Sequence, residues 1–392
     1  SLLHPVSVTP IHGTAYLTKW HAQLLIITVP QFKDALAPLV RYHRAHGMSV
    51  KVSYVGDIYN RYNGGVMDAS AIQTYIAQAQ QTLGTKYVLL VGADTYDYHN
   101  YLGCPRSRLC GSTHTDPKSH TPTFTPSWNP ANTSLVPSLY TRDDYYGEIP
   151  SDEQYVDRSS GPTTAIGRIP AITSGDVKMA VAKTLAYLQS PNSSMQAVFA
   201  AGGGDPTFQQ GSDDLAALLP AVYHVARADE GAANASGARK ALLQGIKSNA
   251  TLVDYVGHGN LEQWGQPPAL LTKSLAGQLG NTKPALFLGW GCQTAYHVDP
   301  TDRSLNATLL FARGGATLTL GSTGLDLADD QITLAKQFFH ELLTDPGVST
   351  VGDALRVAEG AALQQDPAAR QPVASYEIFG DPTLPVAPLR SP

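Results

Sequence analysis

Two stretches decide the fold of this chain: VDYVGHGNLEQW at residues 253–264 and ALFLGWGC at residues 285–292. In each, an apolar run of strand-forming residues stops at a glycine, and a reactive side chain follows at once, His258 in the first and Cys292 in the second. Strands buried on both faces read as continuous apolar runs, and in open α/β sheets the active crevice lies beyond the carboxyl ends of such strands. We therefore predict two buried strands that carry a histidine and a cysteine to one edge of a sheet.

The spacing of these two residues suits catalysis by a thiol. The segment between them has room for one crossover connection, so the two strands can be parallel neighbours. A nearby imidazole raises the thiolate fraction of a cysteine by taking its proton, so His258 is the natural base for Cys292. Gly257 and Gly259 permit a tight turn and leave the N–H of Gly259 open to a substrate oxygen. That N–H and the backbone N–H of Cys292 are the predicted oxyanion hole.

A structural explanation competes with the catalytic one. A lone buried cysteine is more often a small core residue than a nucleophile, and a Gly-His-Gly triplet is a weak motif by itself. The occurrence of both reactive residues at matched strand ends, each beside glycine, favours catalysis.

The composition narrows the class of protein. The chain has 392 residues, 43% hydrophobic and 15% charged, which is ordinary for a globular protein with one large or two smaller domains. A formal charge of −5 gives no electrostatic case for binding nucleic acid or an anionic membrane. No apolar run approaches the roughly 18 residues of a membrane span. The chain begins at Ser1 without a signal segment, so we expect a processed or trimmed product. We also expect a monomer.

Strands and helices alternate along the sequence, which predicts the α/β class. We expect two open, mostly parallel sheets flanked by helices: an N-terminal subdomain at residues 1–165 and a C-terminal catalytic subdomain at residues 166–392, with a caspase-like sandwich in the second. A long excursion at residues 98–162 separates the two. Besides the strands before His258 and Cys292, the predicted strands are 24–29, 48–55, 86–92, 165–171, 196–203, 223–228 and 316–323. The predicted helices are 32–47, 69–84, 176–189, 213–222, 238–248, 304–315, 332–343 and 351–363.

Several segments together resemble the gingipain-type cysteine peptidases, which share the caspase-like clan fold. They include GTKYVLLVGADTYDY, DDYYGEI, AIGRIPA, YVGHGNLEQWG, GGATLTLGSTG and the closing YEIFGDPTLPV, and they span nearly the whole chain. The resemblance implies an endopeptidase that works through a thioester, with His258 and Cys292 at the family's catalytic positions. It also implies an exported bacterial enzyme, extracellular, periplasmic or on the cell surface. Relatives often bind structural calcium, whereas catalysis needs no cofactor.

The chain departs from this family where the histidine would be oriented. Relatives can place a carboxylate just before the Ile-Gly-Arg segment, where this chain has Thr163. A backbone carbonyl or Asp254 is the alternative, since Asp254 shares a strand face with His258 by the period of two. Asp254 is equally well explained as a polar strand residue bonded elsewhere.

Three further assignments concern residues outside the dyad. Cys104 and Cys110 lie close together in a turn-rich loop, which predicts a disulfide typical of exported proteins, two free thiols being the alternative. The acidic loop offers oxygen ligands for calcium, although a solvated loop explains it too. The candidate ligands are Asp143, Asp144, Asp152 and Asp157. The candidate substrate-pocket residues are Trp264, Trp290, Gly291, Leu325 and Asp326. Asp326 favours a basic substrate side chain if it points inward, and Leu325 favours an apolar one.

We therefore expect a secreted cysteine endopeptidase acting on polypeptides. Two alternatives keep the same residues: a sortase-like transpeptidase that resolves the thioester with an amine, and a catalytically silent adhesion or assembly domain.

Overall fold

A computed structural model describes residues 14–99, 101, 111–115, 122–126, 134–157, 161–366 and 369–390. Within the hairpin strands β4 (Gly111–Thr115) and β5 (Pro122–Pro126) it describes the backbone. The predicted disulfide between Cys104 and Cys110 lies outside the described residues.

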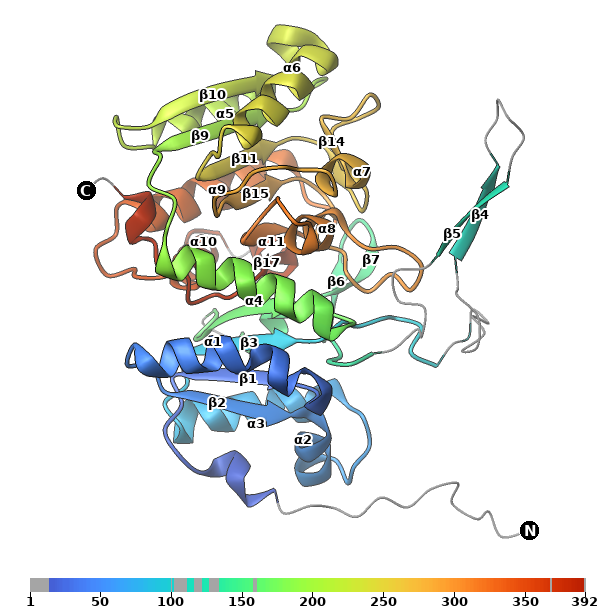
Figure 1. Ribbon diagram of the computed structural model, residues 1–392, viewed down its shortest axis with the longest axis vertical. Helices are drawn as coiled ribbons and strands as arrows, with labels where there is room; N and C mark the ends of the chain where they lie inside the picture. Colours follow the sequence, from blue (N-terminus) through green and yellow to red (C-terminus); the bar gives the residue numbers. More distant parts are fainter. Residues whose placement is uncertain are drawn as a thin grey trace.

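One sheet of ten strands runs through the described part of the chain (Figure 1). In spatial order the strands are β10 (His224–Asp229), β9 (Gln196–Ala201), β11 (Leu252–Val256), β15 (Leu286–Trp290), β16 (Leu318–Ser322), β17 (Tyr376–Phe379), β8 (Ala165–Ile169), β3 (Tyr87–Val91), β1 (Leu24–Thr28) and β2 (Val50–Tyr54). The pairs from β10 to β16 are parallel, as are those from β8 to β2. Strand β17 runs antiparallel to β16. The predicted class, a mostly parallel α/β sheet flanked by helices, is confirmed.

The expectation of two separate sheets is corrected, because the two sets of parallel strands join into one sheet. The joining strand is β17, which pairs with β16 on one side and meets β8 at Phe379 and Arg168 on the other. The sequence analysis assigned no strand at residues 376–379. This short segment comes from the far end of the chain, so its pairing with β8 depends on tertiary structure. The proposed boundary between residues 165 and 166 falls at the first residue of β8.

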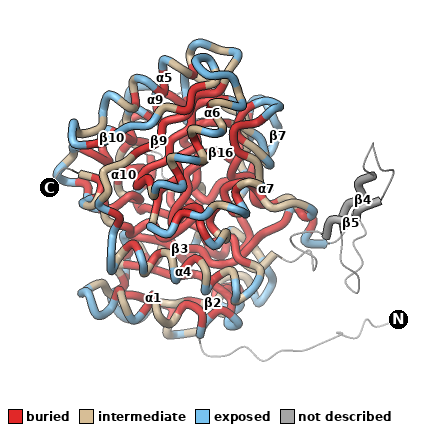
Figure 2. The backbone as a smooth tube through the Cα atoms, turned by 45° about the horizontal axis from the view of Figure 1, so that its top comes forward, coloured by how far each residue is buried: buried red, intermediate tan, exposed pale blue. Residues whose placement is uncertain are grey.

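Helices cover both faces of the sheet (Figure 1). One layer holds α1 (Lys33–Ala45), α4 (Ser174–Gln189), α6 (Glu230–Lys247), α7 (Lys273–Ala276) and α8 (Leu305–Phe311). The other holds α2 (Val55–Tyr62), α3 (Ala69–Thr82), α5 (Pro206–Ala217), α9 (Ala328–Leu343), α10 (Val351–Gln365) and α11 (Arg370–Ser375). The strands are buried, and exposed residues gather on the outer turns of the helices (Figure 2). No helix among the described residues is long and apolar enough to cross a membrane.

The helix starts follow local capping chemistry. Helix α4 begins with a capping box in which Thr173 and Asp176 satisfy each other's backbone N–H groups. Helix α5 begins at Pro206, earlier than the predicted start at residue 213, because Asp205 caps it and accepts a bond from the N–H of Thr207. The earlier start places the first turn of α5 beside the histidine loop, as described below.

Short elements complete the fold around the large sheet. Strands β12 (Gly259–Asn260), β13 (Gln263–Trp264) and β14 (Leu271–Thr272) form a small antiparallel sheet directly after the histidine turn. Strands β6 (Tyr140–Asp143) and β7 (Gly147–Pro150) form a hairpin. The 3-10 turns are η1 (Ala15–Thr18), η2 (Pro30–Phe32), η3 (Glu153–Tyr155) and η5 (Ala387–Leu389).

Candidate active site

The structure brings the two glycine-flanked turns into contact. Strands β11 and β15 are parallel neighbours, and their last residues, Val256 and Trp290, are paired. His258 and Cys292 each follow two residues later, so both leave the sheet at the same edge. A β-carbon added to Gly259 would lie 2.8 Å from the carbonyl oxygen of Cys292 and 3.3 Å from its nitrogen. The backbone N–H groups assigned to the oxyanion hole therefore belong to adjoining turns.

The Cys292 thiol lies between the sheet edge and the loop after β16. Its Sγ donates a hydrogen bond to the carbonyl oxygen of Asp326 at 3.6 Å and accepts one from Nε2 of Gln331 at 3.7 Å. Burial raises the pKa of this half-buried thiol, and the negative charge of Asp326 adds to the rise. Gln293, the next residue, has a φ of 56°, a left-handed conformation that is unusual for a side chain with a β-carbon. Such strain is typical of functional turns.

His258 is exposed, and its ring faces helix α5. The ring of Phe208 meets it edge-on, with a centroid distance of 5.0 Å. Asp205 is the carboxylate that responds to His258: its pKa is lowered by hydrogen bonds with Thr207 and also by the charge of the histidine. The sequence analysis did not single out this carboxylate. The available signal was the Gly-Gly-Gly-Asp-Pro segment, a capping pattern at the end of a strand.

Two hydrogen bonds to the carbonyl oxygen of His258 hold the backbone of the histidine turn. The hydroxyl of Tyr255 donates to the carbonyl oxygen of His258 at 2.6 Å, and the N–H of Gly265 donates to the same oxygen at 2.8 Å. The Tyr255 ring stacks on Trp264, with centroids 4.9 Å apart and planes 8° from parallel. These contacts fix the backbone of the turn and do not involve the imidazole.

The two candidates for orienting the histidine have other partners. Asp254 is fully buried and accepts a hydrogen bond of 2.9 Å from the indole N–H of Trp290. Burial raises the pKa of Asp254 to about 8, so this carboxyl is largely protonated at neutral pH. The hydroxyl of Thr163 donates to the carbonyl oxygen of Val156 at 3.2 Å and accepts a bond from Gln80. The described hydrogen bonds of both residues thus go elsewhere than to His258.

The predicted substrate pocket needs a correction at both tryptophans. Trp264 and Trp290 are 1% and 0% exposed, so neither forms an open wall in this structure. Trp264 packs against Tyr255, and Trp290 packs against Tyr376 with ring centroids 5.1 Å apart. Gly291 is buried between the two turns. Large aromatic residues near a strand end are as suitable for the core as for a pocket, and the sequence does not distinguish the two.

Leu325 and Asp326 lie in the loop that covers the thiol. The N–H of Leu325 donates to Oδ2 of Asp143 at 2.9 Å. The carboxylate of Asp326 points into the protein interior, where its Oδ2 accepts hydrogen bonds from Ser322 at 2.6 Å and Ser375 at 2.8 Å. Its other oxygen is buried and has no hydrogen-bond partner among the described residues. Burial raises the pKa of Asp326 to about 6.

The acidic residues predicted to hold calcium are mostly used by the protein itself. Asp143 accepts the N–H groups of Tyr145 and Tyr146 on its first oxygen, besides that of Leu325 on its second. Both oxygens of Asp152 accept from Arg168 at 2.6 Å. The remaining candidates are Asp144, whose backbone N–H bonds Gln371, and Asp157, which pairs with Arg370. Calcium needs several free oxygen ligands, so this set fits the ion poorly.

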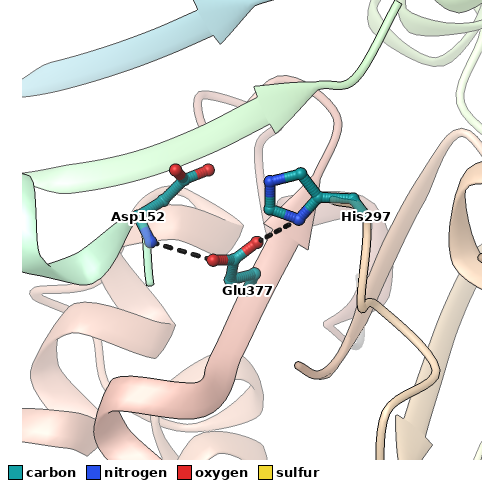
Figure 3. Close-up of side chains that lie close together, drawn as sticks. All are labelled: Asp152, His297 and Glu377. Atoms are coloured by element: carbon teal, nitrogen blue, oxygen red, sulfur yellow. Dashed lines mark hydrogen bonds and ion pairs between the residues drawn. The ribbon is translucent and has the colours of Figure 1, made fainter. Parts of the chain in front are cut away.

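A buried cluster of Asp152, His297 and Glu377 lies next to this loop (Figure 3). Its potential ligand atoms lie within 4.8 Å of one another. The guanidinium of Arg168 is already bonded to Asp152. Burial lowers the pKa of His297 to about 3 and raises that of Glu377, which favours the neutral form of each side chain. The arrangement is therefore a hydrogen-bonded structural cluster rather than a ready cation site.

Loops from the N-terminal half of the chain support the cysteine loop. Nε2 of His297, five residues after Cys292, lies 3.0 Å from the hydroxyl of Ser138. The N–H of Tyr96 donates to the carbonyl oxygen of Val298 at 3.0 Å. The site is consequently framed by both halves of the ten-stranded sheet.

Comparison with known proteins identifies the family. The model of peptidase family C25 matches residues 18–387, and the chain belongs to this family. Gingipain R (RgpB), an Arg-specific cysteine proteinase, superposes with a TM-score of 0.71 at 16% identity, covering 96% of this chain and 80% of that chain. A complex of the pro- and mature domains of RgpB from Porphyromonas gingivalis gives 0.70 at 16% identity, covering 93% and 79%. The search of curated proteins finds no match. Family and fold together support a cysteine peptidase.

Proposed function

We propose that this member of peptidase family C25 is an exported cysteine endopeptidase that cleaves polypeptides with Cys292 as nucleophile and His258 as base. The observation that carries the proposal is the contact between their turns, where Gly259 lies against the backbone of Cys292. Parallel neighbouring strands that deliver a histidine and a cysteine to one sheet edge support this pairing of nucleophile and base.

The proposed reaction proceeds in two steps. His258 takes the thiol proton, and the Cys292 sulfur attacks the scissile carbonyl carbon. The N–H groups of Gly259 and Cys292 hold the resulting oxyanion, and His258 gives its proton to the leaving amine as the C–N bond breaks. Water, deprotonated by His258, then attacks the thioester carbon, and the acid product leaves as the thiol is regenerated.

The resting thiol must turn before the first step. Its hydrogen bond to the carbonyl of Asp326, at 3.6 Å, is weak because a thiol is a weak donor, so little is lost when the side chain rotates toward His258. Catalytic hydrogen bonds are often formed only with bound substrate. The covering loop around Asp326 is accordingly the segment that substrate contacts next to the nucleophile.

An activity-based label tests the proposal directly. A peptidyl acyloxymethyl ketone should modify Cys292, as located by peptide mass mapping, and Cys292→Ala should lose both the label and the hydrolysis of a denatured protein substrate. The circular dichroism spectrum of Cys292→Ala should match the parent, because a small side chain at a strand end contributes little packing. Near-normal hydrolysis by this variant would refute the assignment of the nucleophile.

The same assay separates the alternatives. With a peptide substrate and an added amine nucleophile, a hydrolase gives mainly the free acid, whereas a transpeptidase gives mainly the amide product. A folded protein that neither takes the label nor cleaves any member of a broad peptide library would instead be a silent domain.

A further inference from the structure

The first turn of helix α9 places an amide group on the candidate nucleophile. Gln331 is 2% exposed, and its Nε2 reaches two acceptors: Sγ of Cys292 at 3.7 Å and the carbonyl oxygen of Asp326 at 3.3 Å. The helix fixes the base of this side chain, since the N–H of Gln331 donates to the carbonyl of Leu327 at 3.1 Å. This backbone hydrogen bond closes the first turn of α9, so the turn does not need the side-chain amide of Gln331.

Most of the surroundings of Cys292 disfavour its ionisation. Burial raises the pKa of the thiol, and the charges of Asp326 and Asp143 add to the effect, whereas a hydrogen bond with the Asp326 backbone and the hydrogen bond from the Gln331 amide act in the opposite direction. Four titratable groups interact with the thiol. They are Asp326 after β16, Asp143 of β6, Tyr376 of β17 and Tyr255 of β11.

The geometry of the amide suits a thiolate. In the resting state Cys292 donates its proton to the Asp326 carbonyl. When the thiol loses that proton, its sulfur becomes an acceptor only and can no longer donate to the carbonyl oxygen, so a donor to the sulfur stabilises the ionised form. The side-chain amide of Gln331 carries two N–H bonds, so one serves the carbonyl and the other serves the sulfur. Hydrogen bonds to ionised groups are roughly twice as strong as neutral ones.

We propose that Gln331 is a further catalytic residue, which stabilises the thiolate of Cys292 by donating an N–H to its sulfur. The inference rests on the proposed function for the role of Cys292, but it concerns the ionisation of the thiol and not the cleavage step. It adds a side-chain donor to the sulfur, besides the two backbone N–H groups proposed for the oxyanion hole. Sequence inspection does not reveal it, because Gln331 lies 39 positions after the nucleophile.

The test measures the ionisation of Cys292 without any peptide substrate. The rate of alkylation of Cys292 by iodoacetamide is followed from pH 5 to pH 10 by peptide mass mapping, in the full chain. Gln331→Met keeps the length of the side chain and removes its N–H donor. It should raise the apparent pKa of alkylation by about one unit, which means about tenfold slower alkylation at neutral pH. The kcat/KM for a peptide should fall by a similar factor at neutral pH and recover at high pH.

Two matched variants complete the design. Gln337→Met removes an amide of the same helix that bonds Glu341 instead of the thiol, and it should leave the alkylation profile unchanged. Gln331→Glu keeps the shape and adds a negative charge, so it should shift the pKa upward further than Gln331→Met does. It also serves if the methionine variant fails to fold.

The outcomes separate this inference from the proposed function. Folded Gln331 variants with the parent's alkylation profile would overturn the inference, even where hydrolysis still depends on Cys292. Hydrolysis that survives Cys292→Ala would overturn the proposed function, while an upward shift in the Gln331 variants would still establish the contact with the thiol. A shift of equal size in Gln337→Met would attribute the effect to the helix and refute a specific role for Gln331.

Discussion

The backbone of Gly291 lies directly against the carbonyl group of Gly257. A β-carbon built on Gly291 would come within 2.5 Å of that oxygen, and within 3.4 Å of the nitrogen of Gly259. Each glycine precedes one of the two reactive residues, so this contact couples the position of Cys292 to that of His258. Real β-carbons essentially never approach a carbonyl oxygen so closely, because the backbone on either side cannot yield.

The first prediction follows from this contact. Gly291→Ala should push the two turns apart and reduce kcat/KM at least a hundredfold, since displacements of about 1 Å at a catalytic group have costs of this order. It should also lower the midpoint of thermal unfolding. Gly56→Ala is the matched control, because a β-carbon at this position in helix α2 meets open space. The control should keep full activity and be slightly more stable. Normal turnover by Gly291→Ala would show that the turns tolerate separation.

The second prediction concerns the group that orients His258. Asp205 responds electrostatically to His258, whereas Asp254 bonds Trp290. Asparagine is also a good helix cap, so Asp205→Asn removes the charge and keeps the start of α5. We expect Asp205→Asn to lower kcat several-fold and Asp254→Asn to leave it nearly unchanged. The measurement is kcat and KM for both variants between pH 5 and pH 9. The reverse ranking would restore Asp254 as the orienting residue.

The sequence predicts nine of the ten strands of the large sheet, and the position of His258 and Cys292 after two of them, because this information is local. Each buried strand is a short apolar run, and His258 and Cys292 directly follow two of them. The contacts of Asp326 and Gln331 with the thiol cannot be predicted from the sequence, because they depend on how the loop after β16 folds back over β15. Trp290 illustrates the same limit: its position near Cys292 suggested a pocket wall, and only the packing of Tyr376 reveals it as core.

The third prediction uses the charge beside the thiol. The pKa of Asp326 is about 6, so its carboxyl is mostly ionised at pH 8 and opposes the ionisation of Cys292. Asp326→Asn removes the charge and retains an oxygen that accepts from Ser322 or Ser375. Alkylation of Cys292 should therefore be several-fold faster in the variant at pH 8. The ratio of the two rates should shrink as the pH falls through about 6, where the parent carboxyl becomes protonated. A ratio of one at pH 8 would show that the Asp326 charge does not reach the sulfur.

The last prediction concerns stability and the buried carboxyl of Asp254. Its pKa is about 8 in the folded chain, raised by burial from a usual value of 3.8. Between these two values the folded state holds a proton that the unfolded state has released, so the free energy of unfolding falls as the pH rises from about 4 to about 8. The fall is at most about 1.4 kcal/mol for each pH unit in that window.

Asp254→Asn removes this titration and keeps an oxygen for the indole N–H of Trp290. Other buried acids with raised pKa values, such as Glu153 and Glu377, titrate alike in both proteins. The difference between variant and parent therefore isolates position 254. Urea unfolding at pH 5, 6.5 and 8 should show the variant gaining stability relative to the parent at each step. A difference that stays constant across these three pH values would mean that Asp254 carries the same charge in the folded and unfolded states, and that its hydrogen bond with Trp290 does not depend on the proton.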